Sequence, residues 1–402
     1  MKKDCIVWGA GFFGNKIMES VLLFGYKIIA YCDKNVQLSG KNVGEYPIIS
    51  IEEAKELCRK SNGIDIIIAI KNKGAVQNVE EYVVSEFPKN TKVVYGEHIY
   101  DQIQERRLLK AYEKIKYTWT VSMANQFKQW IENINSELEY WLYEVADVNG
   151  NSHIYNTMCR NNELFGEKEL FDILKAEDIV LDVGCGLVTY FGSKLPDGTK
   201  VQLIPVDALA HYYNRINAKI KDGLKEGYYC HFGMFEFLSK SFQENYADCI
   251  IIKNALDHCI DPFKSLVECF KVLKIGGCLY MKHTRAVAVY ENWVGLHKWN
   301  IDCIDGDFVI WNQDNAVNIS KELKEYAQIE VCYNEREPNR ESQIVTVKIF
   351  KKKNLNPKFF FSEEKEEEGL IQCIDTLMKK MSEDSKWLEK QLETIQVDAE
   401  NN

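Results

Sequence analysis

Short apolar runs alternate with longer polar and amphipathic stretches along the first hundred residues of the chain. Residues 5–8, 27–31, 65–70 and 92–95 are apolar runs of a length that suits buried strands of a parallel sheet. Stretches with helical periodicity separate them. Strands that alternate with helices in this way indicate βαβ units, so we predict a doubly wound α/β domain over residues 1–100.

A second series of strands and helices follows residue 150. We expect a short helical stretch after Gly186, and a longer helix that begins at Pro262, because proline suits the first turn of a helix. That helix is expected to end at a glycine stop over residues 274–277. We therefore predict a second doubly wound domain over residues 151–352. The runs that predict its strands are 179–181, 200–206, 228–231, 247–253, 278–282 and 344–350.

Two further segments have helical periodicity. Apolar and aromatic residues recur at three- and four-residue steps from Ile115 to Val145, which predicts a helical connector over residues 101–150. This connector is a single helix or a helical pair that packs on both domains, or it lends its aromatic residues to a substrate lid. Residues 353–402 combine an acidic linker with an amphipathic tail helix. The tail docks on its own chain or on a second copy, so a homo-oligomer formed through the connector or the tail stays open.

Composition narrows the choice of partners and compartment. The net charge of −10 argues against a nucleic-acid partner, which requires a basic surface. Apolar runs are too short for a membrane span. Asp4 and Gly9 interrupt the N-terminal apolar segment, which we interpret as a strand rather than an export signal. The 13 cysteines contain no CxxC pair, and scattered thiols are typical of a reducing compartment, so we expect a cytoplasmic protein.

A glycine motif follows the first predicted strand. Gly9, Gly11 and Gly14 match GxGxxG, and Asp33 lies 19 residues after Gly14, near the spacing at which an acid meets a ribose hydroxyl. The alternative is that these glycines serve only close packing of the helix on the strand. The candidate nucleotide-binding residues of this domain are Gly9, Gly11, Phe12, Gly14 and Asp33.

The first domain also resembles a known family. Residues 33–35, Gly40 and residues 44–48 are similar to the N-terminal nucleotide-sugar-binding domain of bacterial sugar acyltransferases, over roughly residues 3–85. The resemblance implies a nucleotide-sugar ligand, and NAD remains an alternative. A Tyr-x-x-x-Lys dyad for hydride transfer does not follow the glycine motif, which counts against redox chemistry.

The stretch 179–186 has the pattern of a nucleoside site in an α/β domain. A strand runs into Asp182 and then into two glycines, whose missing Cβ atoms let a ligand approach the backbone, and the next helix is expected to point its positive N-terminus at the same crevice. Asp207 ends the second strand 25 residues after Asp182. A carboxylate has two oxygens, which suits it to accept hydrogen bonds from both hydroxyls of a ribose.

The order of these motifs resembles the class I S-adenosylmethionine-dependent methyltransferases over roughly residues 160–350. Residues 182–186 look like their first motif, Asp207 like their ribose-binding acid, and residues 248–277 like their fourth strand and its following glycine turn. Val188 replaces a third glycine of the first motif. The cofactor-binding residues that the resemblance implies are Asp182, Gly184, Cys185, Gly186, Asp207, Gly233, Met234, Phe235 and Asn254.

The segment after the third strand departs from the family pattern. Gly233-Met-Phe235 lacks the acid that often binds the adenine amino group. We therefore expect backbone groups, and packing against Met234 or Phe235, to hold the adenine.

A methyl acceptor that is a hydroxyl benefits from a general base, and histidine is the usual choice near neutral pH. His258, His283 and His297 follow strands where the family places its substrate, and Asp257 is positioned to orient or replace His258. Alternatively, His297 and Trp299 line the acceptor pocket. The histidines lack i,i+4 spacing and the carboxylates do not cluster, so the sequence predicts no metal site.

These patterns together predict two Rossmann-like α/β domains joined by a helical segment, with a C-terminal helix. The expected function is S-adenosylmethionine-dependent methylation of a small-molecule or saccharide acceptor, with O-methylation of a sugar in surface polysaccharide biosynthesis as the preferred form. Two alternatives remain: a bifunctional protein with an NAD-binding redox domain, and a non-catalytic methyltransferase-like subunit. The sequence leaves open the acceptor atom, the identity of the base and the oligomeric state.

Overall fold

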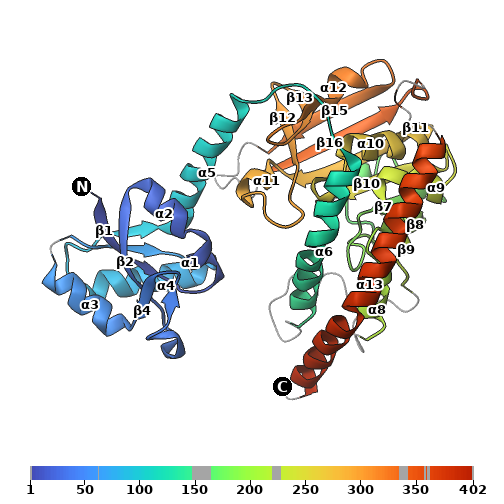
Figure 1. The fold of residues 1–402 in the computed structure, drawn as a ribbon. Helices are drawn as coiled ribbons and strands as arrows, with labels where there is room; N and C mark the ends of the chain where they lie inside the picture. The colour runs from blue at the N-terminus through green and yellow to red at the C-terminus, as the bar shows by residue number, and fades with distance from the viewer. Residues whose placement is uncertain are drawn as a thin grey trace. The chain divides into compact units, whose positions relative to one another are not determined.

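The computed structural model describes residues 2–61, 63–146, 164–219, 228–334, 343–356, 359 and 363–400. The chain folds into two compact units, Met1–Lys114 and Ile115–Asn402. Each unit is built on its own α/β sheet (Figure 1). The predicted fold class is confirmed: both sheets are largely parallel and carry helices between their strands.

The first unit contains a six-stranded sheet in the order β3-β4-β2-β1-β5-β6. The central strands pair in parallel, and β3 pairs antiparallel with β4. The four strands predicted from apolar runs are present, and the sequence pattern missed β3 and β4. The strands are β1 Lys3–Trp8, β2 Tyr26–Cys32, β3 Asn42–Val43, β4 Tyr46–Ile49, β5 Asp65–Ile68 and β6 Val93–Tyr95.

Local signals in the sequence start and end the helices of this unit. Ser50 and Glu53 form a reciprocal capping box at the start of α3, and the Asn72 side chain accepts the amide hydrogen of Ala75 at the start of α4. Gly25 ends α2 in the left-handed region, with φ of 112°. The helices are α1 Phe12–Lys16, α2 Met18–Phe24, α3 Ile51–Lys60, α4 Lys73–Glu86 and α5 Gly96–Tyr112.

The second unit contains a seven-stranded sheet in the order β15-β16-β11-β10-β7-β8-β9. Strands from β9 to β11 pair in parallel, and β16 and β15 complete one edge antiparallel. The order reverses between β7 and β10, the position at which doubly wound sheets bind ligands. The strands are β7 Ile179–Val183, β8 Gln202–Asp207, β9 His231–Phe232, β10 Ala247–Lys253, β11 Leu273–Thr284, β15 Ala327–Tyr333 and β16 Ile344–Lys351.

A small antiparallel sheet and several helices surround this sheet. The small sheet is formed by β12 Asn300–Ile304, β13 Asp307–Trp311 and β14 Ala316–Asn318. The helix predicted at Pro262 is α10, capped by the Asp261 side chain, which accepts the amide hydrogen of Lys264 at 2.9 Å. The helices of the described part of this unit are α6 Met123–Ala146, α8 Ala210–Asn217, α9 Leu238–Ser241, α10 Pro262–Val272, α11 Val287–Tyr290, α12 Ile319–Glu322 and α13 Glu363–Glu400.

The tail helix α13 packs on its own chain, beside α6 and α8 (Figure 1). Leu377 and Leu388 of α13 are buried in the same apolar cluster as Ile134 of α6. The Tyr212 hydroxyl of α8 donates a hydrogen bond to the Asp384 carboxylate of α13 at 3.1 Å. Docking of the tail on its own chain, one of the two arrangements open from the sequence, is the one found here.

Two predicted helical stretches differ from the structure. The periodic stripe that starts at Ile115 is helical only from Met123, where α6 begins, and α5 ends at Tyr112. Trp119 lies between them, where its ring stacks on Trp299 at 5.0 Å, so tertiary packing prevails over helical periodicity. The short helix expected after Gly186 is absent from residues 187–201, all of which are described. Side chains bond backbone amides there instead, including the Tyr228 hydroxyl, which accepts the Thr189 amide hydrogen at 3.1 Å.

Among the described helices, none is both long enough and apolar enough to cross a bilayer.

Candidate functional site

The loop after β7 carries two glycines that the backbone and the packing both require. Gly184 and Gly186 have φ of 75° and 66°, in the left-handed region that side chains disfavour. A Cβ atom at Gly184 would lie 2.4 Å from the Cβ of Ala255, and one at Gly186 would lie 2.4 Å from the ring of Trp141. The loop therefore presses against the segment that follows β10 and against α6, and it forms part of a cavity wall.

Asp207, at the end of β8, ties this loop to the neighbouring strand. Its Oδ2 accepts the amide hydrogen of Gly186 at 3.0 Å, and its Oδ1 accepts that of Leu209 at 2.8 Å. Burial raises the pKa of the Asp207 carboxyl to about 6, against the opposite effect of these two hydrogen bonds. The carboxylate also lines the cavity, so its remaining lone pairs are available to a ligand.

Asp182 has a buried oxygen that accepts no hydrogen bond. The side chain is 2 % exposed, and its Oδ2 has no partner among the described residues. Burial raises the pKa of this carboxyl to about 7, opposed by the Thr189 hydroxyl and the charge of Lys253. An orphaned acceptor on a cavity wall indicates a place for a ligand donor.

The cavity beside these two acids has a volume of about 670 Å³, within the usual range for small-molecule sites. Most of the cofactor residues predicted from the sequence line it: Asp182, Gly184, Cys185, Gly186, Asp207, Met234, Phe235 and Asn254. Gly233 does not line it. A Cβ atom at Gly233 would lie 2.5 Å from Val206, so packing against β8 accounts for this glycine.

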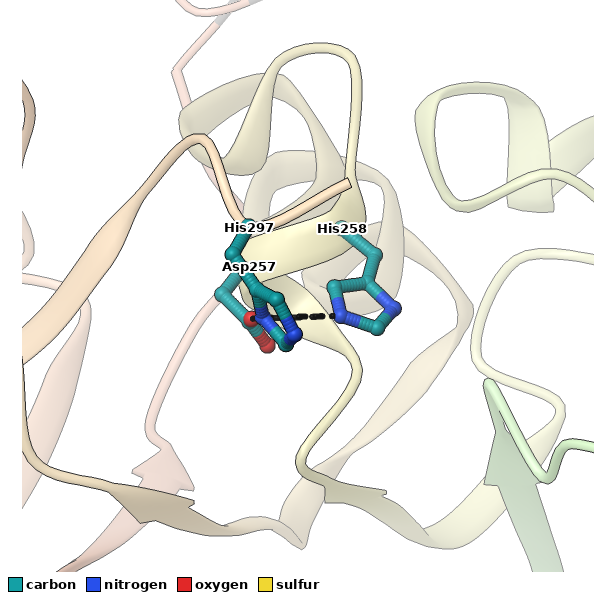
Figure 2. A group of neighbouring side chains, drawn as sticks. All are labelled: Asp257, His258 and His297. Carbon is teal, nitrogen blue, oxygen red and sulfur yellow. Dashed lines mark hydrogen bonds and ion pairs between the residues drawn. The ribbon is translucent and has the colours of Figure 1, made fainter. Parts of the chain in front are cut away.

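The catalytic candidates His258, His283 and His297 meet around the carboxylate of the fourth candidate, Asp257. Figure 2 shows Asp257, His258 and His297. Asp257 and His258 lie in the short turn Leu256–His258 after β10, and His297 comes from the segment between α11 and β12. The Nδ1 of His297 lies 2.7 Å from the Asp257 Oδ2 and 3.1 Å from the Nε2 of His258. His258 and His297 both line the cavity, so the histidine cluster and the glycine loop after β7 share one space.

The electrostatics of the cluster follow from its burial and its charges. Burial raises the pKa of the Asp257 carboxyl. The surrounding imidazoles lower this pKa by a larger amount, so the net pKa is well below its usual range. Burial lowers the pKa of His297, but the hydrogen bond and the charge of Asp257 outweigh it, and the net pKa is raised. Asp257 therefore stays ionised and holds His297 in place.

His283 has a different environment from the other two histidines. It is 1 % exposed, neither of its ring nitrogens has a hydrogen-bond partner, and it does not line the cavity. Its Nδ1 lies 3.9 Å from the Asp257 Oδ1, and burial lowers its pKa to about 4. As a candidate base it would have to act through Asp257, because it does not face the cavity.

Trp299 does not line the acceptor pocket, in contrast to the alternative drawn from the sequence. Its side chain is fully buried, and its indole nitrogen donates a hydrogen bond to the Cys259 carbonyl at 3.1 Å. Trp119 covers one ring face. The residue is part of the core, and only His297 of this pair reaches the cavity.

Sequence reasoning missed the contribution of Glu137. This residue of α6 lines the cavity, its Oε1 accepts the indole hydrogen of Trp141 at 2.8 Å, and its Oε2 lies 3.7 Å from the Nδ1 of His258. The available signal was the aromatic periodicity of α6, whose residues Trp130, Tyr140 and Trp141 also line the cavity. This helix therefore both packs in an apolar cluster of its own unit and contributes side chains to the cavity wall.

The sequence predicts no metal site, because its histidines lack metal-ligand spacing and its carboxylates do not cluster. In the folded chain, however, two histidines and a carboxylate that are not at such a spacing lie together. His258 and His297 are 39 residues apart, yet they join Asp257 in a group whose ligand atoms all lie within 4.8 Å of one another. Imidazole and carboxylate are common ligands of divalent transition metals.

In the first unit, packing accounts for two of the three glycines in the GxGxxG motif. A Cβ atom at Gly9 would lie 2.6 Å from the Ala69 carbonyl oxygen, and one at Gly14 would overlap the Gly9 carbonyl oxygen. A Cβ atom at Gly11 would meet no atom within 4 Å, so packing does not require glycine there. Phe12, beside it, is 83 % exposed.

Asp33 of the first unit organises its own loop. Its Oδ2 accepts the amide hydrogen of Ala10 at 2.8 Å, and its Oδ1 accepts that of Asn35 at 2.9 Å. The acid thus ties the glycine turn to the end of β2, in the same way that Asp207 ties the cofactor loop to β8.

A model of a known protein family matches part of each unit. Residues 181–281 match the family described as "Methyltransferase domain", and residues 4–79 match the "PglD N-terminal domain". Both resemblances drawn from the sequence are thereby confirmed. No curated protein matches the chain.

Three solved structures with some likeness to this chain are described here. The CurJ carbon methyltransferase is 17% identical, with a TM-score of 0.32 over 45% of this chain and 51% of its own. NodS from Bradyrhizobium japonicum WM9, an N-methyltransferase in complex with S-adenosyl-L-homocysteine, is 14% identical, with a TM-score of 0.30 over 44% of this chain and 80% of its own. The YcgJ protein from Bacillus subtilis is 14% identical, with a TM-score of 0.27 over 44% of this chain and 94% of its own.

The first of these structures is matched over only about half of its length, and TM-scores of this size do not support a transfer of substrates or partners. The family match at residues 181–281 covers the loop after β7, Asp207 and the Asp257–His258 pair. The chain therefore contains a region that matches a methyltransferase domain, at residues 181–281, and a region that matches a PglD N-terminal domain, at residues 4–79.

Proposed function

We propose that the protein methylates a hydroxyl group of a saccharide or sugar-linked small molecule, with S-adenosylmethionine as methyl donor. The observation that carries this proposal is the shared cavity: the predicted cofactor loop and the cluster of Asp257, His258 and His297 open into the same space. A donor and an acceptor held there would be close enough to react.

The residues of the cofactor wall fit the chemistry of the donor. When bound, S-adenosylmethionine supplies a methyl group on a positively charged sulfur, which leaves as a neutral thioether once an acceptor attacks the methyl. The unpartnered oxygen of Asp182 suits an ammonium or hydroxyl donor of this ligand, and Asp207 suits its ribose hydroxyls. Met234 and Phe235 offer apolar contact to the adenine ring, in place of an acid.

The histidines of the cavity wall are the groups that activate the acceptor. A hydroxyl becomes a better nucleophile as it loses its proton, and a ring nitrogen of His258 or His297 is the group placed to receive that proton. Asp257 holds His297 in orientation through the 2.7 Å contact. The aromatic side chains of Trp130, Tyr140 and Tyr190 complete the cavity and offer flat faces to a sugar ring.

The saccharide part of the proposal is supported by the first unit. Its match to the PglD N-terminal domain agrees with the resemblance to sugar acyltransferases, so a nucleotide-sugar is the preferred ligand of this unit and NAD the alternative. A methylated saccharide or sugar-linked molecule belongs to polysaccharide biosynthesis. The 12 described cysteines are free thiols, which suits a reducing compartment, and we place the reaction in the cytoplasm.

A direct test incubates the full chain with methyl-labelled S-adenosylmethionine and a panel of nucleotide-sugars, and measures label transfer to the acceptor. Asp207→Ala should abolish both transfer and calorimetric binding of S-adenosylhomocysteine. Asp172→Ala, at an exposed position of the same unit, is the matched control and should preserve both. Failure of the unaltered protein to bind S-adenosylhomocysteine would contradict the proposal.

The role of the first unit is tested separately. Gly11→Trp places a bulky ring in the open space at the glycine turn and should weaken nucleotide-sugar binding to the full chain at least about tenfold. Val84→Trp, at an exposed position of α4, is the control. Equal binding by the two variants would mean that the ligand of this unit does not approach the glycine turn.

A further inference from the structure

Three side-chain atoms of kinds that bind metals meet at one wall of the cavity. The Asp257 Oδ2, the His297 Nδ1 and the His258 Nε2 are separated by 2.7, 3.1 and 3.4 Å. They come from two segments of the chain, which the backbone amide of Lys298 links through a 3.3 Å hydrogen bond to the Asp257 carbonyl. The triangle is therefore held by the fold and not by flexible side chains alone.

Protons cannot satisfy all three contacts of this triangle. A neutral imidazole nitrogen either donates one hydrogen or offers one lone pair. Suppose that His297 Nδ1 donates a hydrogen bond to Asp257. The Nε2 of His258 then either points a lone pair at the carboxylate or carries a hydrogen that lies close to the hydrogen of His297. If His297 Nδ1 carries no hydrogen, two acceptors face each other at 2.7 Å. Each assignment leaves one of the three contacts without a hydrogen bond, beside an Asp257 carboxylate that is buried.

A cation among the three atoms removes this conflict, because all three then offer lone pairs to one charge. Tetrahedral zinc with nitrogen and oxygen ligands places neighbouring ligand atoms about 3.3 Å apart, which follows from bond lengths of roughly 2.0–2.1 Å. The observed separations lie around that value. Ring nitrogens and a carboxylate also form the donor set that suits such a metal.

The groups behind the triangle have the arrangement expected around a metal. The second ring nitrogen of a ligating histidine usually faces a carboxylate. Here the Nδ1 of His258 faces the Glu137 carboxylate at 3.7 Å. The remaining oxygen of Asp257 faces the ring of His283, which is buried and has no hydrogen-bond partner. Both histidines of the triangle line the cavity, so a ligand in the cavity can approach their open side.

We propose that Asp257, His258 and His297 bind one divalent cation of the zinc class, with a coordination position open to the cavity. Its use in the reaction rests on the proposed function: an acceptor hydroxyl in the open position would become more acidic through the charge of the metal. The acceptor oxygen would then form its bond to the methyl carbon while the carbon–sulfur bond breaks. The proton of the hydroxyl would pass to Glu137, which lines the same cavity.

The test uses Co²⁺ as a spectroscopic probe on the full chain, after removal of metals by a chelator and at a pH near 8. We expect visible d–d absorption that saturates at a single equivalent, and competition by Zn²⁺. The variant His258→Gln/His297→Gln should bind Co²⁺ at least about a hundredfold more weakly. His98→Gln, at an exposed histidine of the first unit, should bind like the unaltered protein.

Calorimetric titration with S-adenosylhomocysteine separates this inference from the proposed function and shows that the double variant is folded. Binding of S-adenosylhomocysteine without Co²⁺ binding would overturn the metal site and leave an imidazole base. Co²⁺ binding that survives in the double variant, or that shows thiolate charge-transfer absorption, would place the metal on cysteines and also overturn it. Co²⁺ binding without S-adenosylhomocysteine binding would support the metal site and contradict the methyltransferase function.

Discussion

The indole ring of Trp141 occupies the space in which a side chain on Gly186 would begin, with 2.4 Å between the ring and the position of that Cβ atom. Helix α6 therefore reaches the loop after β7 and restricts its shape. Trp141 is itself held by Glu137, which accepts its indole hydrogen at 2.8 Å. One helix thus connects the cofactor wall of the cavity with the histidine cluster.

This contact predicts the effect of Gly186→Ala. The added methyl group collides with Trp141, and the positive φ of 66° adds a penalty of about 1–2 kcal/mol for a residue with a Cβ atom. We expect a lower free energy of unfolding and loss of S-adenosylhomocysteine binding. Denaturant titration of Gly186→Ala, Trp141→Ala and the double variant checks the cause, since removal of the ring should relieve part of the damage. Additive effects of the two substitutions would show that the collision is not the source.

Glu137→Gln tests the link between α6 and the cluster. The amide keeps the size of the side chain but loses the negative charge that faces the Nδ1 of His258 at 3.7 Å. We expect kcat to fall at least about tenfold, with little change in the dissociation constant of S-adenosylhomocysteine. Glu132→Gln, at an exposed position of the same helix, is the control and should leave both quantities unchanged. A weaker cofactor affinity at unchanged kcat would place Glu137 at the donor and not at the acceptor.

The pKa of Asp207 predicts a pH dependence of cofactor binding. Burial raises this pKa to about 6, and ribose hydroxyls donate hydrogen bonds to the ionised form. Binding of S-adenosylhomocysteine should therefore release a proton near pH 6, and affinity should fall by up to roughly tenfold per pH unit below that value. Calorimetry in two buffers of different ionisation enthalpy measures the proton release. Asp207→Asn should bind more weakly and lose this pH dependence.

Stability in the absence of ligand should have the opposite pH dependence. The pKa of Asp182 and of Asp207 is raised in the folded chain to about 7 and about 6, so the folded state binds protons that the unfolded state has released. Their contribution to stability is fully present below about pH 4 and is lost as the pH rises through 6 and 7. Thermal unfolding of Asp182→Asn/Asp207→Asn against pH should lack this decline. A decline of the same size in the double variant would assign it to other groups.

Trp299→Ala tests the assignment of this residue to the core. Its fully buried ring packs against Trp119, and its removal should cost about 3–5 kcal/mol of unfolding free energy, the usual range for a buried Trp→Ala. Trp299→Phe should recover most of the stability and leave the KM for the acceptor unchanged. A specific rise in KM in the phenylalanine variant would return Trp299 to the acceptor pocket.

The sequence by itself determined the fold class and the position of the glycine loop after β7. Short apolar runs such as residues 247–253 specify buried parallel strands because both faces of such strands are covered. The order of strand, acid and glycine at residues 179–186 then places the loop at the carboxyl edge of the sheet, where the strand ends. Glycine suits this loop because the backbone at Gly184 and Gly186 is left-handed. These signals are local, so periodicity and spacing are sufficient to predict them.

The tertiary structure alone decided which residues share the cavity. Glu137 and His297 are far from Asp257 along the chain, and only the packing of α6 and of the segment before β12 brings them to the turn after β10. Trp119 belongs to the helical stripe of the connector, and Trp299 is a neighbour of the catalytic candidate His297 in the sequence. In the structure their rings stack on each other, because the burial of large apolar rings outweighs local helix propensity. Long-range contacts of this kind leave no fixed spacing in the sequence, and for this reason the histidine cluster was visible there only as separate candidates.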